Sequence, residues 1–276
     1  MNKKRAFSQG VLWVVFILVI LINIFPLVWM ISTSLKSNGE IFSSEIHIIP
    51  HQPTISSYTT VFKDYPITTW YKNSFLSTVG VTALQIIVSL AAAFGISYFR
   101  TKWNNVAFYF LIVTMVIPFQ VTMIPNYITV SKLGLKDTLS AVILPYAANA
   151  TTFFYLYQNL KTIPRAYFEV ADIEGASVLW SFWHVACGLS KGAISAIIIL
   201  TVIDSWNLYF WPLLVLTKAG THTLTIAIQE FQDFEMGSRW GPFMAVATLA
   251  SIPVVVAYLF FQRNIINAFI SAGLKG

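Results

Sequence analysis

The residues of this chain that could do chemistry gather in one stretch, Pro164–Gly192. It is the longest weakly hydrophobic run in the second half of an otherwise apolar chain. Its charged residues are Arg165, Glu169, Asp172, Glu174 and Lys191. These residues provide charge for docking, whereas nothing around them completes a catalytic arrangement.

No catalytic or metal-binding motif accompanies this stretch. The sequence lacks HExxH, GxSxG and CxxC, and the string GLSKG at Gly188 has neither the spacing nor the strand-to-helix context of a P-loop. The single cysteine, Cys187, excludes an internal disulfide and a cysteine-based metal cluster. The histidines are scattered without ligand spacing: His47, His51, His184 and His222. We therefore expect no enzyme activity, no metal site and no cofactor in this chain.

The composition indicates a membrane protein. Of the 276 residues, 57% are hydrophobic and only 10% are charged, whereas an ordinary soluble domain has about 25% charged residues. Long continuous apolar runs predict an all-α, polytopic membrane protein rather than a β-barrel, whose strands alternate in segments of about 10 residues. The formal charge of +6 is typical of basic cytoplasmic loops. Since no basic cluster is longer than Lys3–Arg5, we expect no nucleic-acid binding.

The apolar runs predict six transmembrane helices in a single domain, 1–276. The first run is too long for the h-region of a signal peptide, about 7–15 residues, so we expect an uncleaved span that Pro26 kinks. Pro118 and Pro125 in the third run suit a helix that lines a path. The predicted spans are 11–31, 73–99, 105–130, 139–160, 193–216 and 242–261.

Six spans put both termini on one side of the membrane. The two termini, the 100–104 turn and the loop at about 161–192 hold ten Lys/Arg and three Asp/Glu, while the other three loops hold seven of each. This Lys/Arg bias predicts that both termini and the 161–192 loop are cytoplasmic.

Physical arguments leave two interpretations of the 161–192 loop open. Pro164 could stop the fourth span or open a new helix, and Glu169, Asp172 and Glu174 are expected near the N-terminal part of that helix, where carboxylates favour its dipole. The helix could rest on the bilayer through apolar anchors. It could equally dock a protein, because small residues let another surface come close. The small residues are Ala171, Gly175 and Ala176, and the anchors are Phe168, Leu179, Trp180, Phe182 and Trp183.

The string EVADIEGAS resembles the EAA loop of ABC importer permeases, whose common form is EAAxxDGA. The sequence keeps Glu169, Ala171, Gly175 and Ala176, but has Val170 for an alanine and Glu174 for an aspartate. LSKGA resembles the family's LPLSKPA, with Gly188 and Gly192 where prolines are usual. Most of the chain resembles the sugar-transport branch, the second permease of the maltose-transporter type, in strings such as FPLVWMISTSLK, MVIPFQVTMIPNY, KLGLKDTLSAVILP and DSWNLYFWPLLVL.

This resemblance implies the type I ABC importer permease fold and a multi-pass place in a prokaryotic plasma membrane. The permease would move a sugar, an oligosaccharide, by alternating access after an extracytoplasmic binding protein delivers it. Its partners would be a second permease chain of different sequence and two ATPase subunits, which use ATP and Mg²⁺. The ATPase-coupling residues would be Arg165, Phe168, Glu169, Ala171, Glu174, Gly175 and Ala176.

Asp204 is the acidic residue inside a predicted span. A carboxylate at the bilayer centre costs about 2.5–3.5 kcal/mol, so it normally faces a cavity or a partner. Asp204 could line the substrate pathway with Asn207 and Tyr209 and contact sugar hydroxyls. Alternatively it could make a structural hydrogen bond to the partner permease or to a kinked helix. Gln120 and Asn126 are weaker candidates for the same pathway.

Three rival functions remain to be weighed. The same branch of permeases also serves other solutes, such as glycerol phosphate. A secondary transporter would need repeat symmetry and ion-site residues in the membrane, and Asp204 is the single acidic residue there. A membrane-embedded enzyme would need several ionisable residues converging near the membrane face.

The loop 218–240 could dock the binding protein or simply connect two spans.

Overall fold

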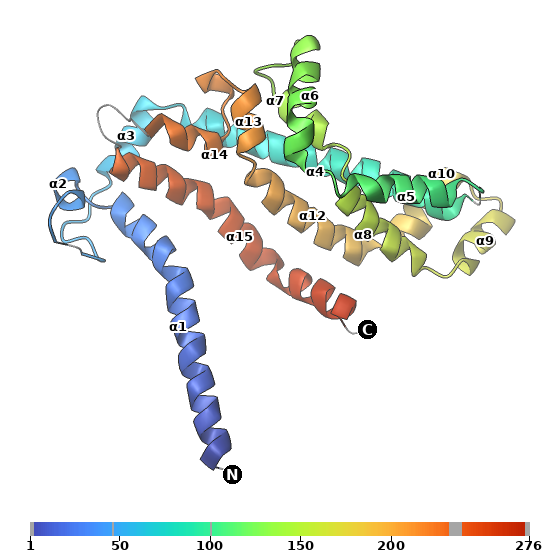
Figure 1. Cartoon of the computed structure of the whole chain (residues 1–276), viewed down its shortest axis with the longest axis horizontal. Coiled ribbons are helices and arrows are strands. Elements are labelled where there is room, and N and C mark those ends of the chain that lie inside the picture. Colours follow the sequence, from blue (N-terminus) through green and yellow to red (C-terminus); the bar gives the residue numbers. More distant parts are fainter. Residues whose placement is uncertain (1–2, 46, 100, 232–238, 274–276) are drawn as a thin grey trace. The chain divides into compact units, whose positions relative to one another are not determined.

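The computed structural model describes residues 3–45, 47–99, 101–231 and 239–273, and this part of the chain contains helices but no strand. Its longest helices are α1 (Lys3–Ser34), α4 (Ile67–Tyr98) and α15 (Trp240–Gly273) (Figure 1). Contacts divide the chain into two compact units. The first comprises Met1–Ile67 and Ala227–Ile252, and the second comprises Thr68–Ile226 and Pro253–Gly276.

At least three helices are long and apolar enough to cross a membrane: Gln9–Ser34, Ile67–Tyr98 and Trp240–Gln262. Three further helix pairs pass the same test together but are bent. They are α5 (Asn104–Thr114) with α6 (Phe119–Lys132), bent by 95°; Leu139–Tyr146 (α7, Leu139–Ile143, and a 3₁₀ turn) with α8 (Ala150–Lys161), bent by 47°; and Val178–Leu189 with α12 (Lys191–Trp206), bent by 78°. Counting each pair as one span would give six.

The third predicted span is wrong as a continuous helix. Helix α5 ends at Thr114, and Pro118 has extended backbone angles, φ −62° and ψ 141°, directly before α6. Proline has no N–H to donate to the preceding turn and disfavours helical geometry at the residue before it. Pro125, in contrast, lies inside α6 without ending it.

The fifth predicted span, 193–216, is also divided. Helix α12 ends at Trp206 and the short helix α13 (Phe210–Val215) follows, with Tyr209 between them at φ −124° and ψ −64°. The first span is one helix, which runs on through Pro26.

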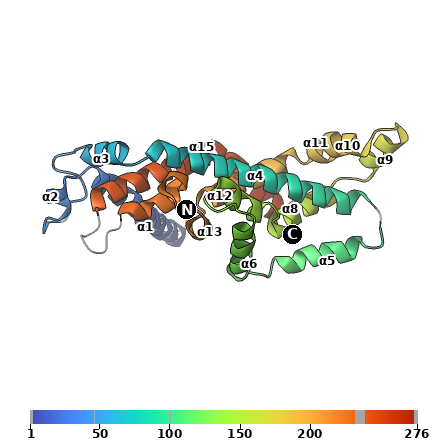
Figure 2. The same ribbon diagram turned by 90° about the horizontal axis from the view of Figure 1, so that it is seen from above.

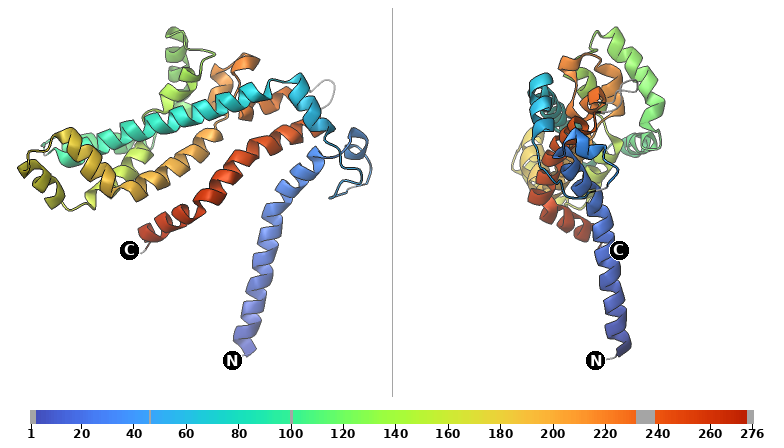
Figure 3. Two further views of the ribbon diagram at one scale, coloured as in Figure 1. Left: turned by 180° about the vertical axis from the view of Figure 1, so that it is seen from behind. Right: turned by 90° about the vertical axis from the view of Figure 1, so that its left-hand side faces the viewer.

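In the first unit, the segment after α1 contacts the start of α15. This segment contains α2 (Asn38–Ile41) and α3 (Ser56–Asp64). Gly241 lies so close to α3 that a Cβ atom there would be 2.5 Å from Oγ of Ser57. Tyr65 contacts Phe231 with ring centroids 4.4 Å apart. Figure 3 lets the reader follow α1 and this segment from two further directions.

In the second unit, α4 is the central helix. The C-terminal half of α4 belongs to an apolar cluster with α8 and α12 that includes Leu90, Phe94, Phe153, Leu156 and Ile197. The buried polar side chains of α4 also bind other segments. Nε2 of Gln85 donates to Thr152 Oγ1 at 2.6 Å, and the hydroxyl of Ser74 accepts from the Leu224 N–H at 2.7 Å. Helix α4 therefore contacts α8 and α12 along its C-terminal half and the segment at Leu224 near its start.

Asp137 links the turn between α6 and α7 to the segment after α13. Its backbone N–H donates to the Val215 carbonyl at 2.8 Å, and its carboxylate accepts from the Thr217 N–H at 2.5 Å and the Lys218 N–H at 3.1 Å. Asp137 has φ 59°, a left-handed conformation that Asp and Asn tolerate best after glycine. Hydrogen bonding by the Thr217 N–H holds the pKa of Asp137 below its ordinary value of 3.8.

The stabilising effect of this carboxylate should therefore depend on pH. Because the folded-state pKa is lowered, the stabilisation is present above the unfolded value and is lost as pH falls through the folded value. The Asp137→Asn variant keeps the backbone preference but loses the charge. We expect its melting temperature to lie below that of wild type at neutral pH and to approach it in acid. An unchanged difference across pH would contradict this assignment.

Candidate functional site

The 161–192 segment is a helix, a tight turn and a second helix. Helix α9 (Ala166–Ile173) follows Pro164. After the turn, α10 (Val178–Trp180), a π-helical stretch (Ser181–Ala186) and α11 (Cys187–Leu189) lead to α12. Helix α9 lies beyond the ends of α4 and α8 (Figure 2), which leaves one side of it open.

Gly175 creates the tight turn. Its φ of 74° is costly for residues with a Cβ atom. The Gly175 N–H donates to the Asp172 carbonyl at 3.1 Å, and the Ala176 N–H donates to the Ala171 carbonyl at 2.9 Å. This is the Schellman pattern of a helix C-terminus. The turn is thus defined by backbone hydrogen bonds that depend on this glycine.

The turn corrects the predicted position of the acidic residues. Glu169 lies in the first turn of α9, as expected. Asp172 lies in the last turn, and Glu174 caps the C-terminus. The prediction that all three lie near the N-terminal part is wrong, because Gly175 ends the helix after only eight residues.

One face of α9 contacts α4. The ring of Phe168 lies 6.2 Å from that of Phe94 and 5.8 Å from that of Tyr98. The Tyr98 hydroxyl donates to Asp172 Oδ1 at 2.6 Å. Ala171, only 5% exposed, is buried. Phe168 and Ala171 therefore join α9 to its own chain, and neither is on the open face.

The other face of α9 is exposed and mixed in character. Arg165 Nε lies 3.2 Å from Glu169 Oε1, an i,i+4 ion pair with both side chains largely in solvent. Glu174 and Gly175 are exposed, and Ala176 is half-buried. Three large apolar side chains accompany them at intervals of three residues: Tyr167, Val170 and Ile173, which is 85% exposed. We call this exposed set, residues 165, 167, 169, 170, 173, 174 and 175, the α9 face.

Sequence reasoning missed the apolar part of the α9 face and the role of Tyr98. The spacing of Tyr167, Val170 and Ile173 could have revealed the former, because residues three apart share a side of a helix. No sequence signal pairs Tyr98 with a residue 74 positions later. At Gly188 and Gly192 the backbone does not require glycine and there is open space for a Cβ atom, so nothing in the structure explains these two residues.

The substrate-pathway candidates lie on α6, on α12 and beside α13. Asp204, in the last turn of α12, is exposed in this chain, and Asn207 caps that helix with Nδ2 donating to the Ile203 carbonyl at 2.8 Å. Tyr209 packs against the apolar cluster that joins α6, α7 and α13. Gln120 is exposed in the first turn of α6, and Asn126 is half-buried. In the part of the chain that the structure describes, no group of three or more His, Cys, Asp or Glu residues could hold a metal ion.

The Tyr98→Phe variant tests whether α9 and α4 move together. It removes the hydroxyl that binds Asp172 but keeps the ring that contacts Phe168. A hydrogen bond to a charged group contributes about 1.5–3 kcal/mol, less when it is exposed as here. We expect faster hydrogen exchange of the α9 amides, with an unchanged melting temperature, when the variant is compared with wild type. Tyr109→Phe, a change to an exposed ring on α5, is the control. Unchanged exchange in Tyr98→Phe would show that the hydroxyl does not hold α9 against α4.

Comparisons with known proteins agree with this architecture. Residues 85–270 match the family described as "Binding-protein-dependent transport system inner membrane component". An ABC transporter permease protein of Caldicellulosiruptor sp. (strain Rt8B.4) is 33% identical over 253 residues, 91% of each chain. The arabinooligosaccharides transport system permease protein AraQ of Bacillus subtilis (strain 168) is 28% identical over 264 residues, 95% of this chain and 94% of that one.

Two further similarities bear on the solute and on the fold. The sn-glycerol-3-phosphate transport system permease protein UgpE of Yersinia pestis bv. Antiqua (strain Antiqua) is 27% identical over 266 residues, 94% of this chain and 95% of that one. A chain in the crystal structure of a bacterial ABC transporter that imports the acidic polysaccharide alginate superposes with a TM-score of 0.85. That match covers 95% of this chain and 98% of the other at 23% identity, and it shows the shared fold.

Proposed function

This chain belongs to the family of binding-protein-dependent transport system inner membrane components, and we propose that the solute it moves is an oligosaccharide. We also propose that ATPase subunits bind the α9 face and drive transport from there. The chain is an ABC transporter permease subunit with the type I fold, and it is not itself an enzyme. AraQ, named for arabinooligosaccharides, supports the sugar. UgpE, named for sn-glycerol 3-phosphate, supports the alternative solute.

The observation that carries the coupling proposal is the two-sided character of α9. One face is joined to α4 through Phe168 and Asp172, while the other is open, with an ion pair and three apolar side chains. A helix that only rested on lipid would need no such rigid turn behind it. A helix that transmits movement needs both a docking face and a firm connection to a span.

The proposed mechanism is alternating access. ATP closes the two ATPase subunits, which move α9, and α9 moves α4. Changing a population from 1:99 to 99:1 requires about 5.5 kcal/mol of differential binding. An aromatic pair contributes about 0.5–1.5 kcal/mol beyond its buried area. The connection therefore has to use the Phe168 contacts and the Tyr98–Asp172 hydrogen bond together, rather than either alone.

The proposed assembly has six spans in this chain, with both termini and α9 in the cytoplasm of a prokaryotic cell. The three bent helix pairs support six spans, and the Lys/Arg bias of the loops supports the orientation. The partners are a second permease of different sequence, two ATPase subunits that use ATP and Mg²⁺, and an extracytoplasmic binding protein. The 218–240 loop, of which 232–238 lie outside the described residues, is a candidate docking segment for the binding protein.

The Asp204→Asn variant tests the substrate pathway. If the Asp204 carboxylate accepts hydrogen bonds from sugar hydroxyls, its loss should cost about 1.5–3 kcal/mol, a tenfold or larger increase in transport KM. A purely structural role would lower protein yield or stability without a selective change in KM. Asp64→Asn, at the end of α3, is the matched control. Unchanged uptake and apparent affinity in Asp204→Asn would exclude Asp204 from the pathway.

Uptake into proteoliposomes tests the function itself. The chain would be reconstituted with its partner permease and ATPase subunits, and the loaded binding protein would be supplied outside. We expect ATP-dependent accumulation of a labelled oligosaccharide such as arabinotriose. Accumulation of glycerol 3-phosphate alone would establish the alternative solute. Uptake driven by an ion gradient without ATP would contradict the proposal.

A further inference from the structure

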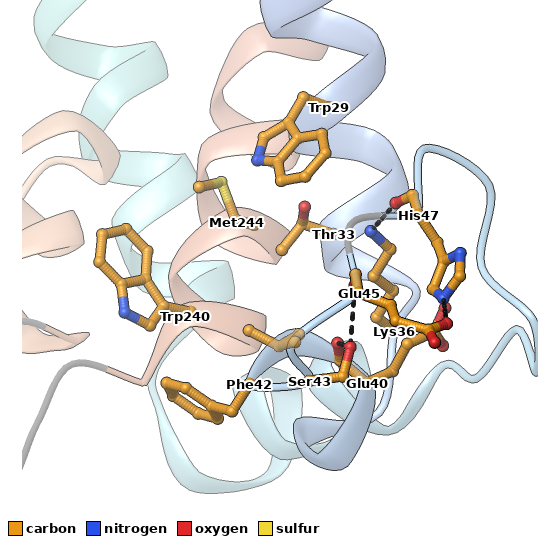
Figure 4. A pocket seen from close by; sticks show the side chains of 11 residues that line it. Trp29, Thr33, Lys36, Glu40, Phe42, Ser43, Glu45, His47, Trp240 and Met244 are labelled. Atoms are coloured by element: carbon orange, nitrogen blue, oxygen red, sulfur yellow. Dashed lines mark hydrogen bonds and ion pairs between the residues drawn. The ribbon is translucent and has the colours of Figure 1, made fainter.

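A pocket of about 320 Å³ lies in the first unit, at the end of α1. It is surrounded by Trp29 and Thr33 from the last turns of α1, by residues 40–43, 45 and 47 from α2 and the loop after it, and by Trp240 and Met244 from the start of α15 (Figure 4). Small-molecule sites measure about 300–1,000 Å³. The pocket is thus large enough for one ring of a ligand.

Two buried polar side chains on the α1 side of the pocket lack a full set of partners. Lys36 is 4% exposed, and its ammonium group donates to the His47 carbonyl and lies 4.6 Å from the centre of the Trp29 ring. No carboxylate among the described residues lies within salt-bridge distance of it. Thr33 is 5% exposed, and its buried hydroxyl has no hydrogen-bond partner in the part of the chain that the structure describes. Buried polar groups normally find partners, so these two groups point to an occupant.

Glu40 and Glu45, which lie beside Lys36 in Figure 4, supply hydrogen-bond acceptors. Glu40 uses Oε1 to accept from the His51 N–H at 2.9 Å. Glu45 is paired with His47 at 3.1 Å while 79% of its side chain is exposed. Each carboxylate retains acceptor capacity, since an ionised carboxylate has about four lone-pair positions.

The ammonium group, the hydroxyl and the two carboxylates together exclude several classes of ligand. A small anion would meet the two carboxylates, and a cation would meet Lys36. An apolar ligand would bury the ammonium without a new partner, which is costly. A neutral polyhydroxyl ring satisfies all of them, because each hydroxyl both donates and accepts and the C–H face can cover an indole such as that of Trp240, which is 42% exposed.

We propose that this pocket, whose lining includes none of the pathway candidates, is a carbohydrate-binding subsite for a single sugar ring. This inference rests on the proposed function, because in the proposed orientation the pocket lies on the extracytoplasmic side, where a sugar first reaches the chain. Lys36 donates to ring hydroxyls, Glu40 and Glu45 accept from them, and Trp240 covers the apolar face.

Saturation-transfer NMR on the complete transporter in lipid nanodiscs tests the subsite. The probes are the neutral sugars arabinotriose and maltotriose, without ATP or binding protein. We expect transfer to at least one probe, with apparent affinity reduced about tenfold in Trp240→Ala, the usual scale for removing a central contact. Glu45→Gln, an exposed change that should not disturb folding, should also weaken binding. Trp13→Ala, on the exposed part of α1, should not.

Two results would overturn the subsite: no transfer to any probe, or equal affinity in wild type, Trp240→Ala and Glu45→Gln. Uptake assays on the same preparations separate this failure from failure of the proposed function. ATP-dependent oligosaccharide uptake with no binding at the pocket would reject the subsite alone. Pocket binding without any oligosaccharide uptake would reject the proposed function alone.

Discussion

Replacing Glu169 with lysine should abolish co-purification of the chain with its ATPase subunits and reduce ATP-dependent uptake by at least about tenfold. In the wild type, Arg165 lies 3.2 Å from the Glu169 carboxylate. The change puts a cation beside Arg165 instead. It also reverses a charge on the α9 face. Charge-assisted hydrogen bonds at protein interfaces contribute about 1.5–3 kcal/mol each, and each 1.4 kcal/mol is a factor of ten in affinity.

The same substitution should not unfold α9. An exposed i,i+4 ion pair contributes about 0.3–0.5 kcal/mol, and an acidic residue near a helix N-terminus contributes about 0.3–1 kcal/mol. The contacts of Phe168 with α4 are untouched. Detergent-solubilised Glu169→Lys should therefore elute as a folded chain without ATPase. Asp64→Lys, an equal charge change at the end of α3, should keep the complex. A Glu169→Lys chain that retains ATPase binding and uptake would show that the α9 face is not the docking surface.

Replacing Gly175 with valine should uncouple the transporter. The residue has φ 74°, where a residue with a Cβ atom pays about 1–2 kcal/mol and a β-branched residue pays more. Relief of this strain requires loss of the hydrogen bonds from the Gly175 and Ala176 N–H groups. The end of α9 would then separate from the helix that follows. We expect uptake to fall by about tenfold or more, while basal ATPase activity of any assembled complex persists.

Two control variants isolate the backbone effect. Gly188→Val makes the same change in α11, where the backbone is not left-handed and a Cβ atom would meet no neighbour. It should transport normally. Gly175→Asn should restore much of the activity, because asparagine tolerates the left-handed region better than other non-glycine residues. Equal uptake by Gly175→Val and wild type would mean that the turn is not needed to couple α9 to transport.

Much of the fold could be predicted from composition and apolar length. The helices α1, α4 and α15 are each long enough to cross a bilayer, and the predicted spans 11–31, 73–99 and 242–261 fall within or almost within them. The interruptions could not be located. Both Pro118 and Pro125 can break a helix, and nothing in the sequence indicates that only Pro118 does. Helix α12 ends at Trp206, before Asn207 (φ −85°, ψ 6°) and Tyr209 (φ −124°, ψ −64°), and no proline or glycine marks that end in the sequence.

In the candidate site too, the local sequence predicted the helix but not which of its sides is open. Local sequence predicted that Pro164 precedes a short helix with Glu169 near its start, and the structure confirms it. Which side of that helix is open depends on α4, which lies some 70 residues earlier in the chain. For that reason Phe168 and Ala171, predicted as ATPase contacts, face their own chain, and Tyr167, Val170 and Ile173 take the open side. Whether the α9 face binds ATPase stays a prediction.

Site-specific cross-linking from Ile173 would show whether the α9 face binds the ATPase subunits. Ile173 is the most exposed large apolar residue of α9, at 85%. In a Cys187→Ala background, which removes the single native cysteine, Ile173→Cys would be combined with single cysteines scanned over the ATPase subunit. We expect disulfide cross-links from position 173 to the ATPase, whose yield changes when ATP is added, and none from Phe42→Cys in the first unit. Absence of any cross-link from 173, in a complex that still transports, would contradict binding at the α9 face.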